Sequence, residues 1–187
     1  VSGTTLTIDA GAEASSNASG NLSASQNGAT GGSVTANFTN AIVNLSDSLN
    51  LYNDARAATS YDAAGNEISG NVTGGALSVN FDNSTATVDS IVLGSNGSSA
   101  LAGTVAPGSA GSGVALNVLN GSNIIVADQL TINTSGSTAG PDSVTASSDI
   151  NLLVDNASLA ANGSFSLNAS RSTAAAAGAA NTGIAGT

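Results

Sequence analysis

The chain carries the segment Val34-Thr35-Ala36-Asn37-Phe38-Thr39-Asn40, which recurs 43 residues later as Leu77-Ser78-Val79-Asn80-Phe81-Asp82-Asn83. Both copies follow a Gly-Gly pair, and two weaker copies begin at Val114 and Ile150. In all four, the residues two, four and six positions before the final Asn are apolar. A period of two places three side chains on one face of a strand. The repeat therefore predicts β-structure along most of the chain.

A small residue follows each final Asn, and a second alternating run comes after it; the small residues are Ala41, Ser84, Gly121 and Ala157. Strand, Asn-small turn and strand together are typical of a β-hairpin, because Asn tolerates positive φ. The sequence thus predicts an all-β fold, a hairpin-rich β-sandwich or closed barrel of about 10–12 short strands. A stacked β-solenoid is the alternative for short strands at this spacing, and a propeller, whose blades have a similar repeat length, ranks last.

The composition excludes several classes of function. Twelve acidic residues stand against two basic ones, Arg56 and Arg171, in a chain of 187 residues with a net charge of −10. Nucleic acid binding needs a basic patch that two arginines cannot supply. No apolar run is long enough to span a membrane. The start at Val1 and the lack of sulfur and lysine fit a processed, exported protein at the cell surface.

The sequence contains few residues suited to catalysis or metal binding. His and Cys are absent, which removes the usual general base, the thiol nucleophile and the favoured zinc ligands. We therefore expect no enzymatic activity, no cofactor and no metal. Calcium, which takes oxygen ligands, could use the Asp62–Glu67 loop or Asp47 with Asp54, but solvated turn carboxylates are the favoured interpretation.

The acceptor pattern Asn-x-Ser/Thr for N-glycosylation occurs twelve times. One hypothesis is glycosylation, with candidates at Asn83, Asn120, Asn156, Asn37, Asn44, Asn71, Asn96 and Asn133. The alternative is that Asn, Ser and Thr are simply the polar residues of turns and exposed strand faces.

Three segments divide the chain. Residues 1–10 alternate as a strand, with Thr4, Leu6, Ile8 and Ala10 on one face; residues 11–171 form a body with four hairpin repeats, and residues 172–187 form an Ala/Gly-rich tail. A terminal strand can complete the sheet of a neighbouring molecule, which makes these four residues the candidate donor strand. An ordinary first strand that pairs within its own domain is the alternative.

With its terminal alternation, hairpin-rich body, glycosylation patterns and missing cysteine, the chain resembles donor-strand-linked pilins and the thread-type filaments of archaea. It lacks the disulfide of chaperone-assembled bacterial pilins. The resemblance implies a homopolymer on the cell surface.

The sequence leads to the expectation of a structural subunit of an extracellular filament or adhesive layer, which polymerises by strand exchange or sheet-edge pairing. Its partners would be further copies of itself, with surface or glycan contacts, and would include neither nucleic acid nor a membrane span. A secreted ligand-binding barrel or sandwich, and a segment of a large β-solenoid adhesin, are the alternatives.

Overall fold

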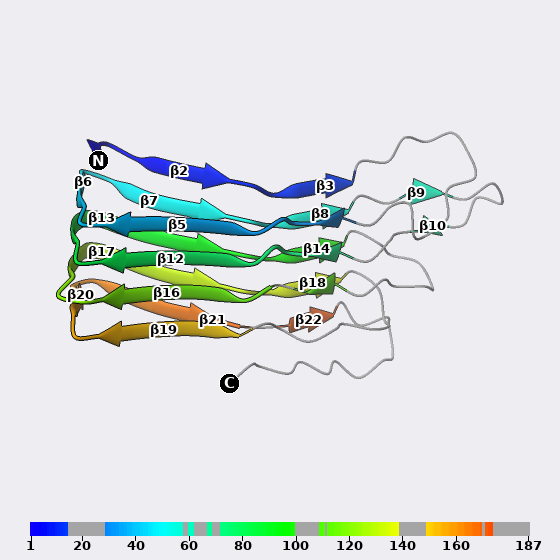
Figure 1. The fold of residues 1–187 in the computed structure, drawn as a ribbon. Coiled ribbons are helices and arrows are strands. Elements are labelled where there is room, and N and C mark those ends of the chain that lie inside the picture. Colours follow the sequence, from blue (N-terminus) through cyan, green and yellow to red (C-terminus); the bar gives the residue numbers. More distant parts are fainter. Residues whose placement is uncertain are drawn as a thin grey trace.

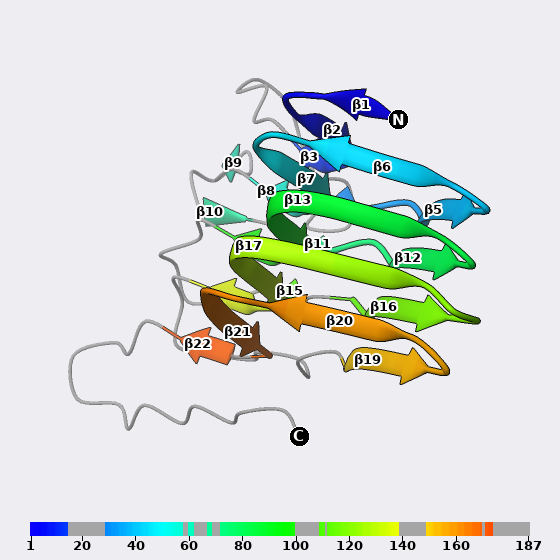
Figure 2. The same ribbon diagram turned by 90° about the vertical axis from the view of Figure 1, so that its left-hand side faces the viewer.

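The structure, a computed structural model, describes residues 1–14, 29–57, 60–61, 67–68, 72–99, 109–110, 112–138, 149–169 and 171–173. The strands follow one another around a common axis, and each turn of the chain lies directly on the preceding one (Figure 1). In the view turned by 90° about the vertical axis, the turns form a regular stack that begins with β1 and ends with β22 (Figure 2).

Three parallel sheets run along the stack, and we call them sheets 1, 2 and 3. Sheet 1 consists of β5 (Val34–Thr39), β12 (Leu77–Asp82), β16 (Val114–Leu119) and β19 (Ile150–Asp155). Sheet 2 consists of β1 (Ser2–Gly3), β2 (Leu6–Asp9), β6 (Ile42–Leu45), β7 (Ser48–Tyr52), β13 (Thr85–Gly94), β17 (Asn123–Asn133), β20 (Ser158–Ala161) and β21 (Ser164–Asn168). Sheet 3 consists of β3 (Ala12–Ala14), β8 (Ala55–Ala57), β14 (Gly97–Ser99), β18 (Gly136–Thr138) and β22 (Arg171–Thr173).

Two small sheets complete the described part of the chain. One is parallel and contains β4 (Ala29–Thr30), β11 (Val72–Thr73) and β15 (Ser109–Ala110). The other pairs β9 (Ser60–Tyr61) with β10 (Glu67–Ile68), and it is the one antiparallel pairing among the described strands.

The predicted all-β class is confirmed. Sheets 1 and 2 face each other across a common core, as the layers of a sandwich do, and the described strands form no closed barrel. The pairing, however, is that of the β-solenoid alternative. Val79 on β12 lies in register with Ala36 on β5 and with Leu116 on β16, so the four copies of the repeat stack on one another.

The predicted hairpins are wrong. The asparagine bends join a strand of sheet 1 to one of sheet 2, and each strand pairs with its equivalent in the next turn. At Asn120-Gly121 both residues have positive φ, and Ser122 N–H donates to Leu119 O at 3.1 Å, as in a hairpin turn. Even there β16 pairs with β12 and β19 and not with β17. Stacking in register packs the inward apolar side chains of each strand against those of the equivalent strands.

The number of strands also exceeds the predicted 10–12, since the described residues form 22 strand segments. The additional segments are short and include Gly/Ser-rich stretches, such as β14 and β18. Backbone groups there pair with the same backbone groups one turn away, whatever their side chains are.

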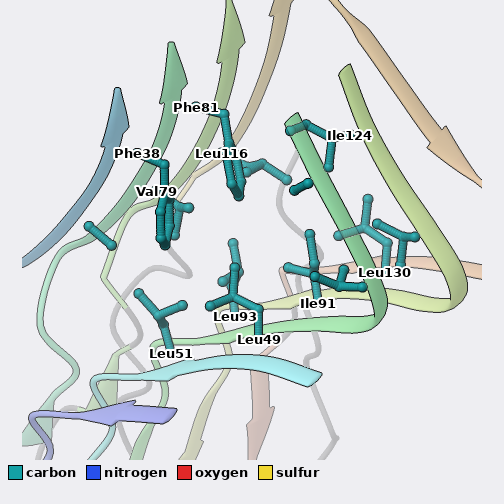
Figure 3. Close-up of a cluster of buried hydrophobic side chains, with 14 of the residues drawn as sticks. Phe38, Leu49, Leu51, Val79, Phe81, Ile91, Leu93, Leu116, Ile124 and Leu130 are labelled. Carbon is teal, nitrogen blue, oxygen red and sulfur yellow. The ribbon is translucent and has the colours of Figure 1, made fainter. Parts of the chain in front are cut away.

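The core lies between sheets 1 and 2, where the inward side chains of successive turns form continuous columns. Figure 3 shows Phe38, Val79 and Phe81 pointing from sheet 1 toward Leu49 and Leu93 of sheet 2. The Phe38 and Phe81 rings stack with centroids 4.8 Å apart and planes inclined by 13°. This separation equals the spacing of adjacent strands, so the in-register pairing itself imposes the stack.

The bends between sheets 1 and 2 form a column of left-handed residues: Asn40, Asn83, Asn120 and Asn156 have φ between 48° and 53°. The Asn83 amide Nδ2 donates to Asn40 Oδ1 at 2.6 Å. Beside this column the buried Ser84 hydroxyl donates to Phe38 O at 2.8 Å and accepts from Ala41 N–H at 2.9 Å. These bonds tie the first bend to the second.

Replacing Asn83 with alanine is expected to lower the free energy of unfolding by about 1–2 kcal/mol. Alanine is strained in the left-handed conformation that Asn83 adopts at φ 48°, and it also loses the hydrogen bond to Asn40. Glycine at the same position avoids the steric cost, so Asn83→Gly should recover part of the loss. Urea denaturation followed by circular dichroism measures both changes. Equal losses for the two variants would contradict the conformational argument.

A second bend explains the Gly-Gly pairs that precede the two strongest repeats. The buried Asn53 amide Nδ2 donates to Gly32 O at 2.5 Å and to Ala76 O at 3.1 Å. A Cβ on Gly75 would lie 1.8 Å from Gly32 O and 2.2 Å from Asn53 Nδ2. Two backbones and an amide therefore meet where only glycine fits.

Candidate functional site

The last turn of the solenoid exposes apolar side chains that the interior turns bury. Phe165 and Leu167 on β21 lie in register with Leu130 and Ile132 on β17, which are fully buried. Phe165 is 52% exposed and Leu167 is 45% exposed, because no further described strand covers them. Val154 on β19, the register partner of buried Val118, is 42% exposed for the same reason. We name Val154, Phe165 and Leu167 the terminal apolar face.

The opposite end of the stack is formed by residues 1–14, which include the candidate donor strand. Leu6 and Ile8 pair with Leu49 and Leu51 on β7 and are half-buried against the core. The exposed Thr4 accepts a hydrogen bond at its backbone O from Asp47 N–H at 3.0 Å.

The exposed Ala10 donates its backbone N–H to Tyr52 O at 3.0 Å. The structure thus places all four candidate residues on the chain's own sheet, in the arrangement that the sequence left as the alternative. Donation of this strand to another copy stays a prediction.

Both ends of the stack leave strand edges without a neighbour among the described residues. At the first end these edges belong to β1, β2, β3 and β5, and at the last end to β19, β20, β21 and β22. An unpaired edge presents a row of backbone N–H and C=O groups to a further strand. Together with the terminal apolar face, the edges form a surface able to accept another parallel turn.

The outer face of sheet 1 carries an amide ladder that the sequence analysis did not identify. Asn80 Nδ2 donates to Asn37 Oδ1 at 2.7 Å, and Asn117 Nδ2 donates to Asn80 Oδ1 at 2.7 Å. The next position, on β19, is Leu153, which is 44% exposed. The signal in the sequence was an Asn three residues before the bend in three copies of the repeat. Identical polar residues at one repeat position indicate stacking of turns.

Three of the candidate glycosylation sites lie at exposed bends, namely Asn83, Asn120 and Asn156, and the amide nitrogens of the first two are engaged. Asn83 Nδ2 donates to Asn40, and Asn120 Nδ2 donates to Asp82 Oδ1 at 2.8 Å. N-linked glycans attach at this nitrogen, so modification would compete with the bend ladder. Asn96 Nδ2 is likewise engaged, with Asp54 Oδ1 at 2.8 Å.

The remaining glycosylation candidates differ in access. Asn44 and Asn156 are exposed, and their side-chain amides make no hydrogen bond with another described residue. Asn37 is exposed and uses its Oδ1 in the amide ladder, whereas the half-buried Asn133 keeps its Oδ1 away from solvent. Asn71 lies outside the described residues. Glycosylation stays a prediction, and Asn37, Asn44 and Asn156 are exposed positions whose amide nitrogens make no hydrogen bond with another described residue.

The calcium candidates do not come together in the described part of the molecule. Asp47 Oδ2 accepts a hydrogen bond from Thr5 Oγ1 at 3.0 Å, and Asp54 Oδ1 accepts from Asn96 N–H at 2.9 Å. Among the described residues no group of three or more His, Cys, Asp or Glu side chains could hold a metal ion. Most of the Asp62–Glu67 loop lies outside them.

Comparison with family models, curated proteins and solved structures finds no match for this chain. The described residues also contain no helix that is long and apolar enough to cross a membrane.

Proposed function

We propose that the chain is a structural subunit of an extracellular filament or adhesive surface layer, extended by sheet-edge pairing between the ends of β-solenoids. The observation that carries this proposal is the pair of open ends. Interior turns bury their inward columns completely, whereas the last turn leaves Val154, Phe165 and Leu167 exposed beside unpaired edges. Solenoids that stay monomeric need end caps with a polar outer face.

The register of the stack supports end-to-end association of copies. If the next copy continues sheet 2 in register, its β2 lies on β21 of the preceding copy. Leu6 then covers Phe165 and Ile8 covers Leu167, which repeats the pairing that Leu6 and Ile8 make with Leu49 and Leu51 within one chain. In the same arrangement β1 lies on β20, and β3 lies on β22.

Edge pairing is favoured over exchange of the N-terminal strand, because β1 and β2 already pair with β6 and β7 of their own chain. Among the described strands, sheet 1 has four levels and sheet 2 has five, from β2 to β21. A continuous stack of copies therefore leaves one position of sheet 1 without a described strand at each junction. That position is where a donated segment would complete the sheet.

A segment of a larger solenoid adhesin is the second candidate, and the repetition itself favours it. Turns with the same bend and the same register can be added without changing the fold. A ligand-binding sandwich has less support, since side chains of the two sheets fill the described space between them.

Purified protein is expected to form end-to-end filaments whose length increases with protein concentration, visible by negative-stain electron microscopy and by sedimentation velocity. Each copy carries a charge of −10, so association should be stronger at about 0.15 M salt than at about 0.01 M, where charge repulsion is less screened. A concentration-independent monomer at both salt concentrations would reject polymerisation and leave the adhesin segment as the better candidate.

A further inference from the structure

An open cavity of about 400 Å³ lies where sheet 2 passes into sheet 3 on the first two turns. It is lined by Asp9, Gly11, Ala12, Tyr52, Asp54 and Arg56. Asp9 ends β2, Ala12 begins β3, Tyr52 ends β7 and Arg56 lies in β8, whereas Gly11 and Asp54 lie in the connections that follow β2 and β7. The cavity therefore spans the first two turns of the stack, and Asp9, Gly11 and Ala12 belong to the turn that forms its first end.

The backbone around the cavity is fixed by the same hydrogen bonds that hold the stack. Ala10 N–H donates to Tyr52 O at 3.0 Å, and Ala12 N–H donates to Asp54 O at 2.8 Å. On the next turn, Asn53 N–H donates to Gly94 O at 2.8 Å. The lining side chains are thus held by a rigid, parallel-paired framework, as an effective binding site requires.

Each carboxylate of the cavity is oriented through one of its oxygens. Asp9 Oδ1 accepts from Gly11 N–H at 3.0 Å. Asp54 Oδ1 accepts from both Asn96 N–H at 2.9 Å and Asn96 Nδ2 at 2.8 Å. The second oxygen of each carboxylate makes no hydrogen bond with another described residue. Two fixed acceptors therefore remain for a ligand.

The tyrosine of the cavity lies against the following turn. A Cβ on Gly94, the register partner of Tyr52, would lie 3.1 Å from Tyr52 Cδ1. The ring thus extends over the glycine and is held close to its backbone. A half-buried ring in this position offers an apolar surface together with a hydroxyl group.

The cavity is also the place where the repeat is broken. In later turns the register partners of Tyr52 are Gly94, Asn133 and Asn168. Arg56 is followed in register by Ser98 and Ser137. Small polar residues are sufficient at these positions in the later turns. At the cavity, by contrast, one of the chain's two tyrosines and one of its two basic residues lie together. Departures from an otherwise consistent pattern are expected at functional positions.

We propose that this cavity binds a neutral, hydroxyl-rich carbohydrate. The free oxygens of Asp9 and Asp54 accept hydrogen bonds from sugar hydroxyls, Arg56 donates to hydroxyl or ring oxygens, and the C–H face of the sugar lies on Tyr52. Two carboxylates against one guanidinium disfavour acidic sugars. The proposal does not depend on filament formation, since all six lining residues belong to one chain.

The test is a titration of the full chain with methyl galactoside, methyl glucoside, methyl mannoside and N-acetylglucosamine, followed by NMR chemical shifts and isothermal calorimetry. At least one of these is expected to bind with a Kd of about 1 mM. Tyr52→Ala and Asp9→Asn are each expected to weaken that binding about tenfold. Asn168→Ala is the matched control, because it changes the same outward position in the last turn and should leave the affinity unchanged.

Sialic acid and choline serve as the opposing probes, one anionic and the other cationic. Binding of either in preference to all the neutral sugars would overturn the proposal, as would the absence of binding by every sugar at about 50 mM, far above the expected Kd. Equal weakening by Asn168→Ala and Tyr52→Ala would also overturn it. Circular dichroism of each variant separates lost binding from lost folding, and Asp9→Asn keeps an oxygen for the bond to Gly11 if Tyr52→Ala does not fold.

Discussion

Replacing Phe81 with alanine is expected to lower the free energy of unfolding by about 3–5 kcal/mol. The ring is fully buried, stacks on Phe38 at 4.8 Å and lies in register with Val118 on its other side. Interior turns are hydrogen-bonded to a neighbouring strand on each side. The neighbouring side chains therefore cannot move into the space that the Phe81 ring leaves. Guanidinium denaturation monitored by circular dichroism measures the loss.

Phe165→Ala is the matched control, since it removes the same side chain from the last turn. Phe165 is 52% exposed and has a register neighbour on one side only, so the loss should stay below about 1 kcal/mol. In a stack stabilised by contacts between adjacent turns, the effect of a substitution depends on whether its turn has neighbours on both sides. Similar losses for Phe81→Ala and Phe165→Ala would contradict this order of turns.

The alternating pattern of the repeat was sufficient to predict strands and their inward residues. Ala36 and Phe38 are buried as the period of two requires, and so are Leu77, Val79 and Phe81. The pattern could not identify the pairing partner of each strand, because alternation is compatible with a hairpin and with a stack. Local turn chemistry favoured the hairpin, yet the long-range match between equivalent positions determined the pairing.

The candidate assembly surface could not be predicted from residue types. Ile150, Leu152 and Val154 follow the same pattern as the buried residues of the preceding copies. Ile150 and Leu152 are only half-buried and Val154 is 42% exposed, because β19 lies at the end of the stack. The alternation of Leu6 and Ile8 was recognised, but their pairing with β7 depends on the register between turns, which the sequence leaves open.

Substituting both Phe165 and Leu167 with lysine is expected to abolish end-to-end assembly while the monomer remains folded. Edge pairing would place these side chains against Leu6 and Ile8 of the next copy, where two ammonium groups would be buried without a partner. In the monomer the same lysines extend into solvent from positions that are already about half exposed. Electron microscopy and sedimentation velocity report assembly, and circular dichroism reports folding.

Ser166→Lys distinguishes burial at the junction from a general effect of charge. Ser166 lies between the two target residues on β21, but its side chain is directed to the outside of the sheet, in register with Thr131. It adds a positive charge to the same strand without placing it in the junction, so filaments should persist. Because the chain carries a charge of −10, any added lysine reduces repulsion between copies. A loss of filaments in the double variant would therefore oppose the electrostatic trend, and it could arise only if the terminal apolar face is buried when copies meet. Filaments that form equally well with both sets of lysines would remove edge pairing at this end of the solenoid as the mode of assembly.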